Sequence, residues 1–264
     1  LGIGSKINLS IFNKWYSKAG TPEIEIKRVQ NNSELKLNIT QKIKKQPSNL
    51  PIPIKLAFMN QRGHFVNFRV NNSIADKEHV HLLTKNKEEI IIDSEEKNLI
   101  PSFLRNFSAP VYLKTDLEQI DYLHILQHDD DAFNKWDASQ NLYFQHLASK
   151  KDILPLTKLL ESLLKSPSMN YSLMSLLIDL PSKSSLENLL KDSDPIDNYY
   201  KRRNLMIEIA TNLKSTFEDL ATLLANDNIC LSKHDGHRSL LGKILNYLSL
   251  IDSETGLDLA KHFS

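Results

Sequence analysis

Residues 110–128, PVYLKTDLEQIDYLHILQH, decide how this chain is organised, because the spacing of apolar side chains changes within them. Before this stretch apolar residues recur at every second position, as in half-buried strands, and after it they recur every three or four positions, as in amphipathic helices. Thr115 followed by Glu118 has the spacing of a helix capping box. We therefore expect a β domain over residues 21–114 and a helical domain over residues 115–264.

The β part predicts an Ig-like β-sandwich. Its longest alternating run is Leu50, Ile52, Ile54, Leu56 and Phe58. Further strands are expected near residues 24–26, 35–43, 64–70, 79–84, 89–93 and 110–114, with turn residues between them. Short strands with a turn about every 8–12 residues are typical of a sandwich. Pro51 and Pro53 cannot donate hydrogen bonds, so we expect the longest run at a sheet edge or along a bulge.

The second part predicts successive amphipathic helices, in an antiparallel array or solenoid without a fixed repeat length. Helices are expected over residues 115–128, from 129 onward, and near 156–164, 171–180, 185–191 and 240–251. An apolar stripe from Met206 to Leu224 predicts one long helix. Residues 1–20 form a separate leading segment, with an isolated helix expected around Trp15.

Composition excludes several classes of function. The chain has 264 residues but only 7 glycines, and none lies between Gly63 and Gly236. Phosphate loops, dinucleotide-binding turns and nucleophile elbows all need glycine at fixed positions, so the sequence excludes these three kinds of site. With 33 basic and 32 acidic residues, the chain has no general attraction for nucleic acid or anionic membranes. The single Cys230 fits a reducing compartment, and no apolar run reaches the length of a membrane span. The balanced charge and the lack of a signal peptide favour a cytoplasmic protein.

Two histidine pairs have spacings that metal sites use. His124 and His128 are four residues apart, as in H-E-x-x-H zinc sites, but Ile125 stands where the catalytic Glu would be. We therefore expect one of these histidines to cap the helix end and the other to lie on the surface. His79 and His81 share one strand face, and we expect a half-exposed pair without metal.

Other candidate residues also have structural explanations. Asp129, Asp130 and Asp131 lack the spacing of a calcium loop and are expected to satisfy a helix N-terminus. Residues 199–203, YYKRR, mix aromatic and basic side chains as nucleic-acid binders do, but fit the first turns of a helix. Spacing shows no histidine partner for Cys230. The residues themselves therefore predict no catalytic, cofactor or metal site.

Four stretches, in the same order, resemble the aminopeptidase N family of zinc-dependent gluzincin peptidases. They are WYSKAGTP at residues 15–22, NFSAPV at 106–111, HDDDAFNKWDA at 128–138 and, more weakly, GHRSL at 236–240. In that family the first stretch ends the catalytic domain, the second closes a small β-sandwich, and the third opens a helical C-terminal domain. In the fourth, Leu241 and Gly242 replace the family's usual basic residue and asparagine.

The resemblance implies a C-terminal portion of a zinc aminopeptidase whose zinc ligands and catalytic Glu lie before Trp15. No family catalytic residue can be assigned to a position in this chain. The parent would release N-terminal amino acids from short peptides, and the partner of this portion would be its own catalytic domain. The sandwich would act as a spacer, the helices would enclose the active site, and an unpacked helix face is expected near Phe263. The alternative is a stand-alone protein-binding scaffold with the same two domains.

Overall fold

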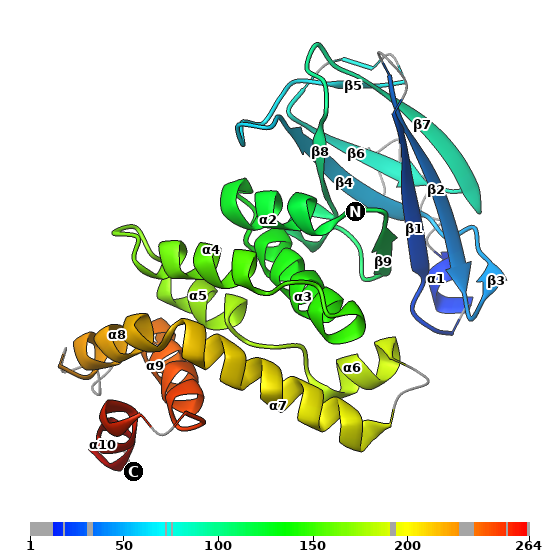
Figure 1. Ribbon diagram of the computed structural model, residues 1–264. Helices are drawn as coiled ribbons and strands as arrows, with labels where there is room; N and C mark the ends of the chain where they lie inside the picture. Colours follow the sequence, from blue (N-terminus) through cyan, green and yellow to red (C-terminus); the bar gives the residue numbers. More distant parts are fainter. Residues whose placement is uncertain are drawn as a thin grey trace. The chain divides into compact units, whose positions relative to one another are not determined.

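The computed structural model describes residues 13–17, 19–30, 34–71, 73–74, 76–190, 194–226, 235–251 and 253–262. By their contacts the residues form two compact units, Leu1–Asn134 and Lys135–Ser264. The first unit contains the strands together with α1 (Asn13–Ser17), α2 (Gln119–His128) and the first turn of α3 (Ala132–Ser149). The predicted fold class, an Ig-like sandwich followed by a helical array, is confirmed (Figure 1).

The sandwich consists of two sheets. The larger has the order β5-β7-β2-β1-β9, with β3 paired to β2, and the smaller has the order β6-β4-β8. The strands are β1 (Glu23–Gln30), β2 (Leu35–Ile43), β3 (Gln46–Pro47), β4 (Ile52–Met59), β5 (Arg69–Val70), β6 (Glu78–Leu83), β7 (Lys87–Asp93), β8 (Ile100–Phe103) and β9 (Tyr112–Thr115). All pairings are antiparallel except β1 with β9, which run parallel.

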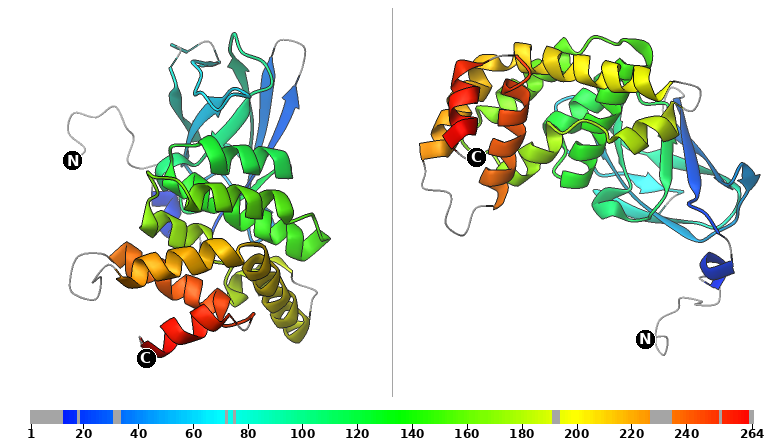
Figure 2. Two further views of the ribbon diagram at one scale, coloured as in Figure 1. Left: turned by 60° about the vertical axis from the view of Figure 1, so that its left-hand side comes forward. Right: turned by 90° about the horizontal axis from the view of Figure 1, so that it is seen from below.

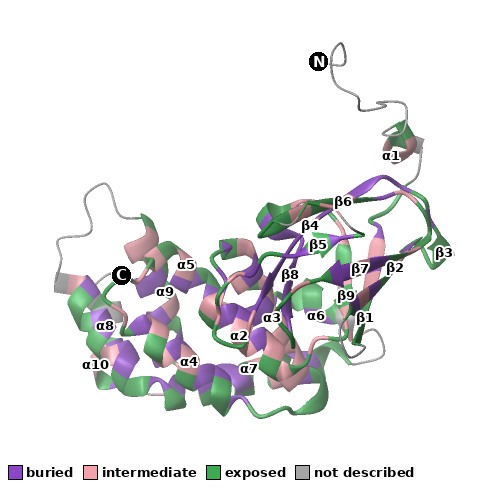
Figure 3. Ribbon diagram, turned by 90° about the horizontal axis from the view of Figure 1, so that it is seen from above, coloured by how far each residue is buried: buried purple, intermediate pink, exposed green. Residues whose placement is uncertain are grey.

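The alternating residues of the sequence form the sandwich core. Leu37, Ile54 and Leu56 are fully buried, and Phe58 packs edge-on against Phe68 with ring centroids 4.8 Å apart. Purple buried segments run along the strands in Figure 3. Burial of this apolar surface, at roughly 25 cal/mol per Å², is the main favourable contribution to the stability of the unit.

The position of β4, which contains the longest alternating apolar run, differs from the prediction. β4 is the middle strand of its sheet, not an edge. Pro53 is tolerated because β8 pairs only with residues 56–59 of β4, so at Pro53 the ladder with β6 is the only one. β8 does not extend as far as Lys55. The backbone N–H of Lys55 donates to the side-chain oxygen Oγ of Ser108 at 3.0 Å. The strand expected over residues 64–70 is reduced to Arg69–Val70, and β8 is a strand that the alternation does not predict.

The start of the first long helix is also shifted. Thr115 is the last residue of β9, and Glu118 is the N-cap of α2. The capping box joins Glu118 to Asp121, whose carboxylate accepts from the Glu118 backbone N–H at 3.1 Å. Arg28 on β1 ties this start to the larger sheet through Asp116 and Asp121.

The second unit is helical. Beyond α3 its helices are α4 (Leu154–Leu164), α5 (Tyr171–Leu177), α6 (Lys183–Leu189), α7 (Pro195–Asn212), α8 (Lys214–Asn226), α9 (Asp235–Leu248) and α10 (Glu254–His262). α9 packs against α5 and α8, and α10 packs against α8 and α9 (Figure 2). Two buried tyrosine hydroxyls donate to the end of α5: Tyr143 to Leu177 O at 2.9 Å and Tyr247 to Ile178 O at 2.6 Å.

The apolar stripe predicts one long helix where the structure has two. The stripe from Met206 to Leu224 is continuous and buried, but the helix breaks at Leu213, which has φ −106° and ψ 10°. α10 lies beyond the helices that the sequence predicts. Cys230 and the expected open face near Phe263 lie outside the described residues.

Candidate functional site around Arg105

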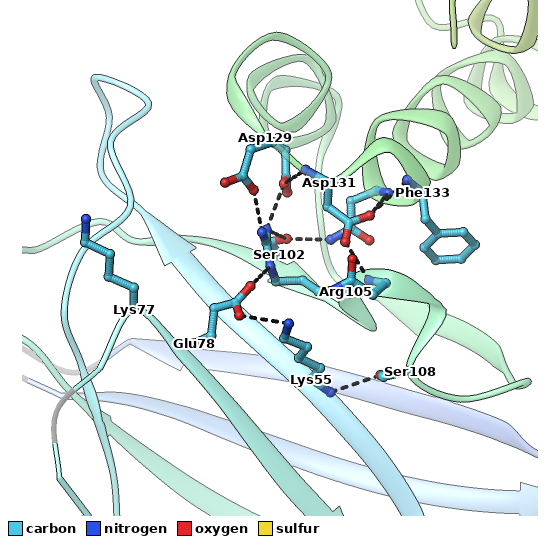
Figure 4. A network of polar contacts seen from close by, with 12 residues as sticks. Lys55, Lys77, Glu78, Ser102, Arg105, Ser108, Asp129, Asp131 and Phe133 are labelled. Carbon is cyan, nitrogen blue, oxygen red and sulfur yellow. Dashed lines mark hydrogen bonds and ion pairs between the residues drawn. The ribbon is translucent and has the colours of Figure 1, made fainter. Parts of the chain in front are cut away.

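Arg105 is the centre of a polar cluster in the first unit (Figure 4). It lies in the short helical turn Arg105–Phe107 that follows β8, and its side chain is only 6% exposed. The guanidinium donates from Nε to Glu78 Oε1 at 2.8 Å and from Nη1 to Ser102 Oγ at 2.9 Å and Asp129 Oδ1 at 2.8 Å. Nη2 also pairs with Asp130. A planar guanidinium can bond several acceptors at once, and this cluster uses all three nitrogens.

The acidic run between α2 and α3 supplies most of these acceptors. The Asp129 side chain is fully buried against Arg105. Asp131 caps α3, because its Oδ1 accepts from the backbone N–H of Phe133 at 2.9 Å and of Asn134 at 3.1 Å. The prediction that this run satisfies a helix N-terminus is therefore confirmed for Asp131. The pairing of Asp129 and Asp130 with Arg105 is not predicted, because that partner lies about 25 residues earlier.

Both basic side chains of the cluster, Lys55 and Arg105, are paired with carboxylates. Lys55 on β4 bonds the second oxygen of Glu78 at 2.8 Å. The pKa of Glu78 is lowered, first by the hydrogen bond from Lys55 and also by Arg105. Burial alone would lower the pKa of Arg105, but Asp130, Asp129 and Glu78 outweigh it and raise that pKa. Glu78 and Arg105 therefore stay ionised near neutral pH. The contacts of the cluster connect strands β4, β6 and β8 to the start of α3.

One of the two histidines of α2 is placed differently from the prediction. His128 is the last residue of α2, as expected, but His124 is half-buried and not on the surface. Their ring centroids are 4.6 Å apart. Burial lowers the pKa of His124, although a hydrogen bond with the backbone of Asn60 and the nearby Asp121 oppose this shift. Both rings pack on the turn after β4, where a Cβ on Gly63 would lie 2.3 Å from His128.

The other predicted residues have the expected structural surroundings. His79 and His81 are half-buried on β6, and His81 Nε2 lies 3.0 Å from Glu88 Oε2. Residues 199–203 lie within the first half of α7, as predicted. Within the described parts of the chain, no three His, Cys, Asp or Glu side chains gather as metal ligands. No helix among the described residues is long and apolar enough to cross a membrane.

The WYSKAGTP stretch also makes contacts with the sandwich. Trp15 in α1 packs on the sandwich core, and its Nε1 donates to Pro51 O at 3.0 Å. Gly20 has φ +117°, a conformation that side chains disfavour, and it lies just before β1. The WYSKAGTP stretch therefore fixes the path of the chain immediately before it enters the sandwich at β1.

The weaker GHRSL stretch is explained by a close helix contact. Gly236 lies in the first turn of α9, where a Cβ would collide with Ser172 Oγ and approach Ser172 N to 2.8 Å. Ser172 belongs to α5, against which α9 packs. Glycine at this position allows the two helices to approach.

Two family models match the chain. Residues 20–116 match a domain of unknown function, DUF3458, described as an Ig-like fold, and residues 119–264 match DUF3458_C, described as ARM repeats. Together these models divide the chain close to Thr115, whereas the contact units divide after Asn134, because α2 and the start of α3 pack with the sandwich.

Curated relatives are named aminopeptidase N. The chain is 25% identical to the protein of Haemophilus influenzae over 98% of its own length and 32% of the relative. It is 26% identical to the Escherichia coli protein, over 79% of this chain and 26% of the relative. The Caulobacter vibrioides protein is 30% identical over 46% of this chain and 15% of the relative. The chain therefore spans less than a third of the length of these relatives.

A solved structure shares the fold. It is the Legionella pneumophila aminopeptidase A in complex with aspartic acid, with a TM-score of 0.78 and 23% identity. The similarity covers 95% of this chain and 30% of that chain.

Proposed function

Because the chain belongs to the family of the DUF3458 Ig-like and ARM-repeat domains, whose relatives here are named aminopeptidase N, we propose that it is one part of a longer zinc aminopeptidase. The longer protein would remove N-terminal amino acids from peptides. Its zinc site would lie outside these 264 residues, where a zinc-activated water would attack the scissile carbonyl. In this portion the proposal assigns no residue to catalysis or metal binding.

One observation carries the proposal. Similarity to an aminopeptidase N extends over 98% of this chain but only 32% of the relative, so the whole chain corresponds to a minor part of a larger enzyme. The contacts of the family-like stretches fit a supporting role: Trp15 and Gly20 fix the entry to the sandwich, and Arg105 with Asp129 fixes the start of α3.

In the proposal the two units contribute to the enzyme by their positions around the catalytic domain and not by catalytic groups. In the proposal the sandwich separates the catalytic domain from the helices, and the helices enclose the active site in the cytoplasm. Enclosure admits short peptides, excludes folded proteins and keeps the reaction away from bulk water. The partners of this chain would therefore be its own catalytic domain and, through it, short peptides.

The test compares the 264-residue chain with the full reading frame from which it comes. We expect the longer protein to hydrolyse aminoacyl chromogenic substrates and to contain zinc, measured by atomic emission, and the shorter chain to do neither. Removal of zinc by a chelator should abolish activity, and added zinc should restore it. The control variant is His79→Gln with His81→Gln in the longer protein, which should keep full activity.

Two results with the 264-residue chain would contradict the proposal. One is hydrolysis by the 264-residue chain alone. The other is stoichiometric zinc binding by that chain that is lost in the variant His124→Gln. A longer protein without aminopeptidase activity would favour the protein-binding scaffold, whose partner could then be isolated with this chain as bait.

A further inference from the structure

Strand β6 lies at an edge of the three-stranded sheet. It pairs with β4 on one side, and among the described strands none pairs with its other side. Two apolar side chains on one face of β6 are exposed to solvent, Val80 at 57% and Leu82 at 41%. The free edge of a sheet presents unpaired backbone groups to any strand that approaches it.

The backbone of β4 shows which groups of β6 face this free edge. Lys55 lies opposite Val80, but its N–H donates to Ser108 and not to β6 (Figure 4). Pro53, which has no N–H, lies opposite Leu82. Pairs without hydrogen bonds alternate with bonded pairs in antiparallel strands, so these two pairs are of the unbonded kind. The N–H and C=O groups of Val80 and Leu82 therefore point to the free edge, where no backbone group of another described residue bonds them.

The other sheet edges have features that discourage pairing with a further strand. β5 has two residues, β9 has four and carries Lys114, and β8 carries Pro101. Edge strands of natural proteins are often short or carry lysine or proline for this reason. β6 has six residues and neither of these two residue types, and its acidic residue, Glu78, is already paired with Lys55 and Arg105. Among the described edges, β6 is therefore the one that is open to a further strand.

We propose that β6 is a self-association surface, at which two copies of the chain pair in antiparallel orientation. With a twofold axis at His81, Val80 of each copy lies opposite Leu82 of the other. The backbone groups of both residues face the edge, so each such pair exchanges both of its hydrogen bonds. The apolar side chains of the two copies then meet on one face, and the two three-stranded sheets become one continuous sheet.

A second copy fits this edge because the strand is complementary to itself. A twofold axis brings the same surface of both copies together, so that surface must match itself in hydrogen bonds, apolar contacts and charge. In the register centred on His81, Glu78 lies beyond the apolar pairs and opposite no other carboxylate. The ring of His81 lies 3.0 Å from Glu88 of its own copy, and this carboxylate compensates a charge on the ring. An axis at Val80 would instead place Leu82 opposite Glu78 and lose the apolar contacts.

The first test is analytical ultracentrifugation of the 264-residue chain from about 1 µM to about 500 µM, because an interface of one strand edge is small and associates weakly. We expect a monomer at low concentration and a dimer at high concentration. No larger species should form, because pairing occupies the β6 edge of both copies.

Val80→Lys should raise the Kd of the dimer about tenfold or more, because it places a charge opposite the apolar Leu82 of the second copy. Leu82→Lys should act in the same way, and it keeps the test decisive should Val80→Lys fail to fold. The matched control is Tyr112→Lys, since Tyr112 is 61% exposed and lies on β9, at an edge of the other sheet. This control should leave the Kd unchanged.

Amide hydrogen exchange, measured by NMR, locates the interface. The amides of Val80 and Leu82 should exchange more slowly at high protein concentration, because they bond only in the dimer. The amides of His79 and His81 bond to β4 in both states and should show no dependence on concentration.

Three results would overturn the proposal: a monomer over the whole concentration range, a dimer that Val80→Lys and Leu82→Lys leave unchanged, or growth beyond the dimer. Protection of the Val80 and Leu82 amides only in the longer protein would also overturn it, since a segment of that protein would then occupy the edge. None of these measurements depends on aminopeptidase activity, so they decide the role of β6 even if the proposed function fails.

Discussion

Replacing Gly63 by Ala should destabilise the first unit through two separate effects. Gly63 has φ +82°, so an alanine there carries left-handed strain of about 1–2 kcal/mol. Its Cβ would also lie 2.3 Å from two ring atoms of His128, and forcing extra atoms into a packed site costs typically about 1–3 kcal/mol. Together these effects give a loss of about 2–5 kcal/mol in the free energy of unfolding.

A double-mutant cycle with His128→Ala isolates the part of the cost that comes from the imidazole ring. Removing the ring relieves only part of the collision, because the Cβ of residue 128 would still lie 2.7 Å from the new Cβ, so Gly63→Ala should cost less in that background than in the wild type but more than the strain of about 1–2 kcal/mol alone. The assay is urea unfolding of each variant, together with hydrogen exchange of the amides around Asn60, because that turn bonds its own backbone through Gly63 N to Asn60 O at 3.0 Å. Exchange should speed up locally in Gly63→Ala.

The control uses the same substitution at a glycine with free space. Gly242 lies in α9, and apart from the adjacent residues and the backbone of the helix itself no described atom lies within 4 Å of the point where an alanine Cβ would stand. Gly242→Ala should therefore stabilise the second unit by about 0.5–1 kcal/mol. The reasoning would be refuted if Gly63→Ala were as stable as the wild type, or if its cost were the same with and without His128.

Three further predictions concern charges. Arg105→Met should cost about 3–5 kcal/mol in urea unfolding, because it leaves the buried Asp129 carboxylate without its partner, and adding Asp129→Asn should restore part of the loss. Burial raises the pKa of Asp137 from 3.8 to about 6, so the folded state binds the proton more tightly and stability falls as pH rises from about 4 to 6. Asp137→Asn should therefore raise the free energy of unfolding by about 1–3 kcal/mol above pH 6, measured by unfolding at several pH values. The lowered pKa of His124 has the opposite sign, so the wild type should lose stability as pH falls below about 6.5, and His124→Gln should flatten that dependence.

Most of the fold follows from local periodicity, and the differences arise where periodicity carries no information. The stripe from Met206 to Leu224 stays in phase across Leu213, so an apolar pattern alone does not show that the helix breaks there. Pro53 favours an edge position because proline has no backbone N–H to donate. Whether a second strand pairs with β4 at Pro53 depends on where β8 ends. Both errors concern relations between elements, which a single sequence does not encode locally.

The site shows the same limit more sharply. The acidic residues before α3 are recognisable as helix-capping groups, and Asp131 does cap α3. Arg105 does not stand out, although it directly precedes the NFSAPV stretch, because an arginine looks the same in sequence whether it is solvated or buried. A signal is nevertheless present: three neighbouring acids carry more negative charge than a helix N-terminus needs, which points to a cation from elsewhere.

The parallel pairing of β9 with β1 has a consequence for the order of assembly during synthesis. Glu23 at the start of β1 lies opposite Tyr112, so the edge of β1 stays open until nearly 90 further residues have been made. The intervening strands can pair as they emerge, but the larger sheet is completed only when Tyr112–Thr115 arrives. Asp116 then bonds Arg28 on β1 at 3.0 Å, immediately before α2 begins. A ribosome that stalls before Tyr112 would therefore hold a sandwich with an exposed strand edge whose backbone groups are unpaired, the type of surface that promotes aggregation.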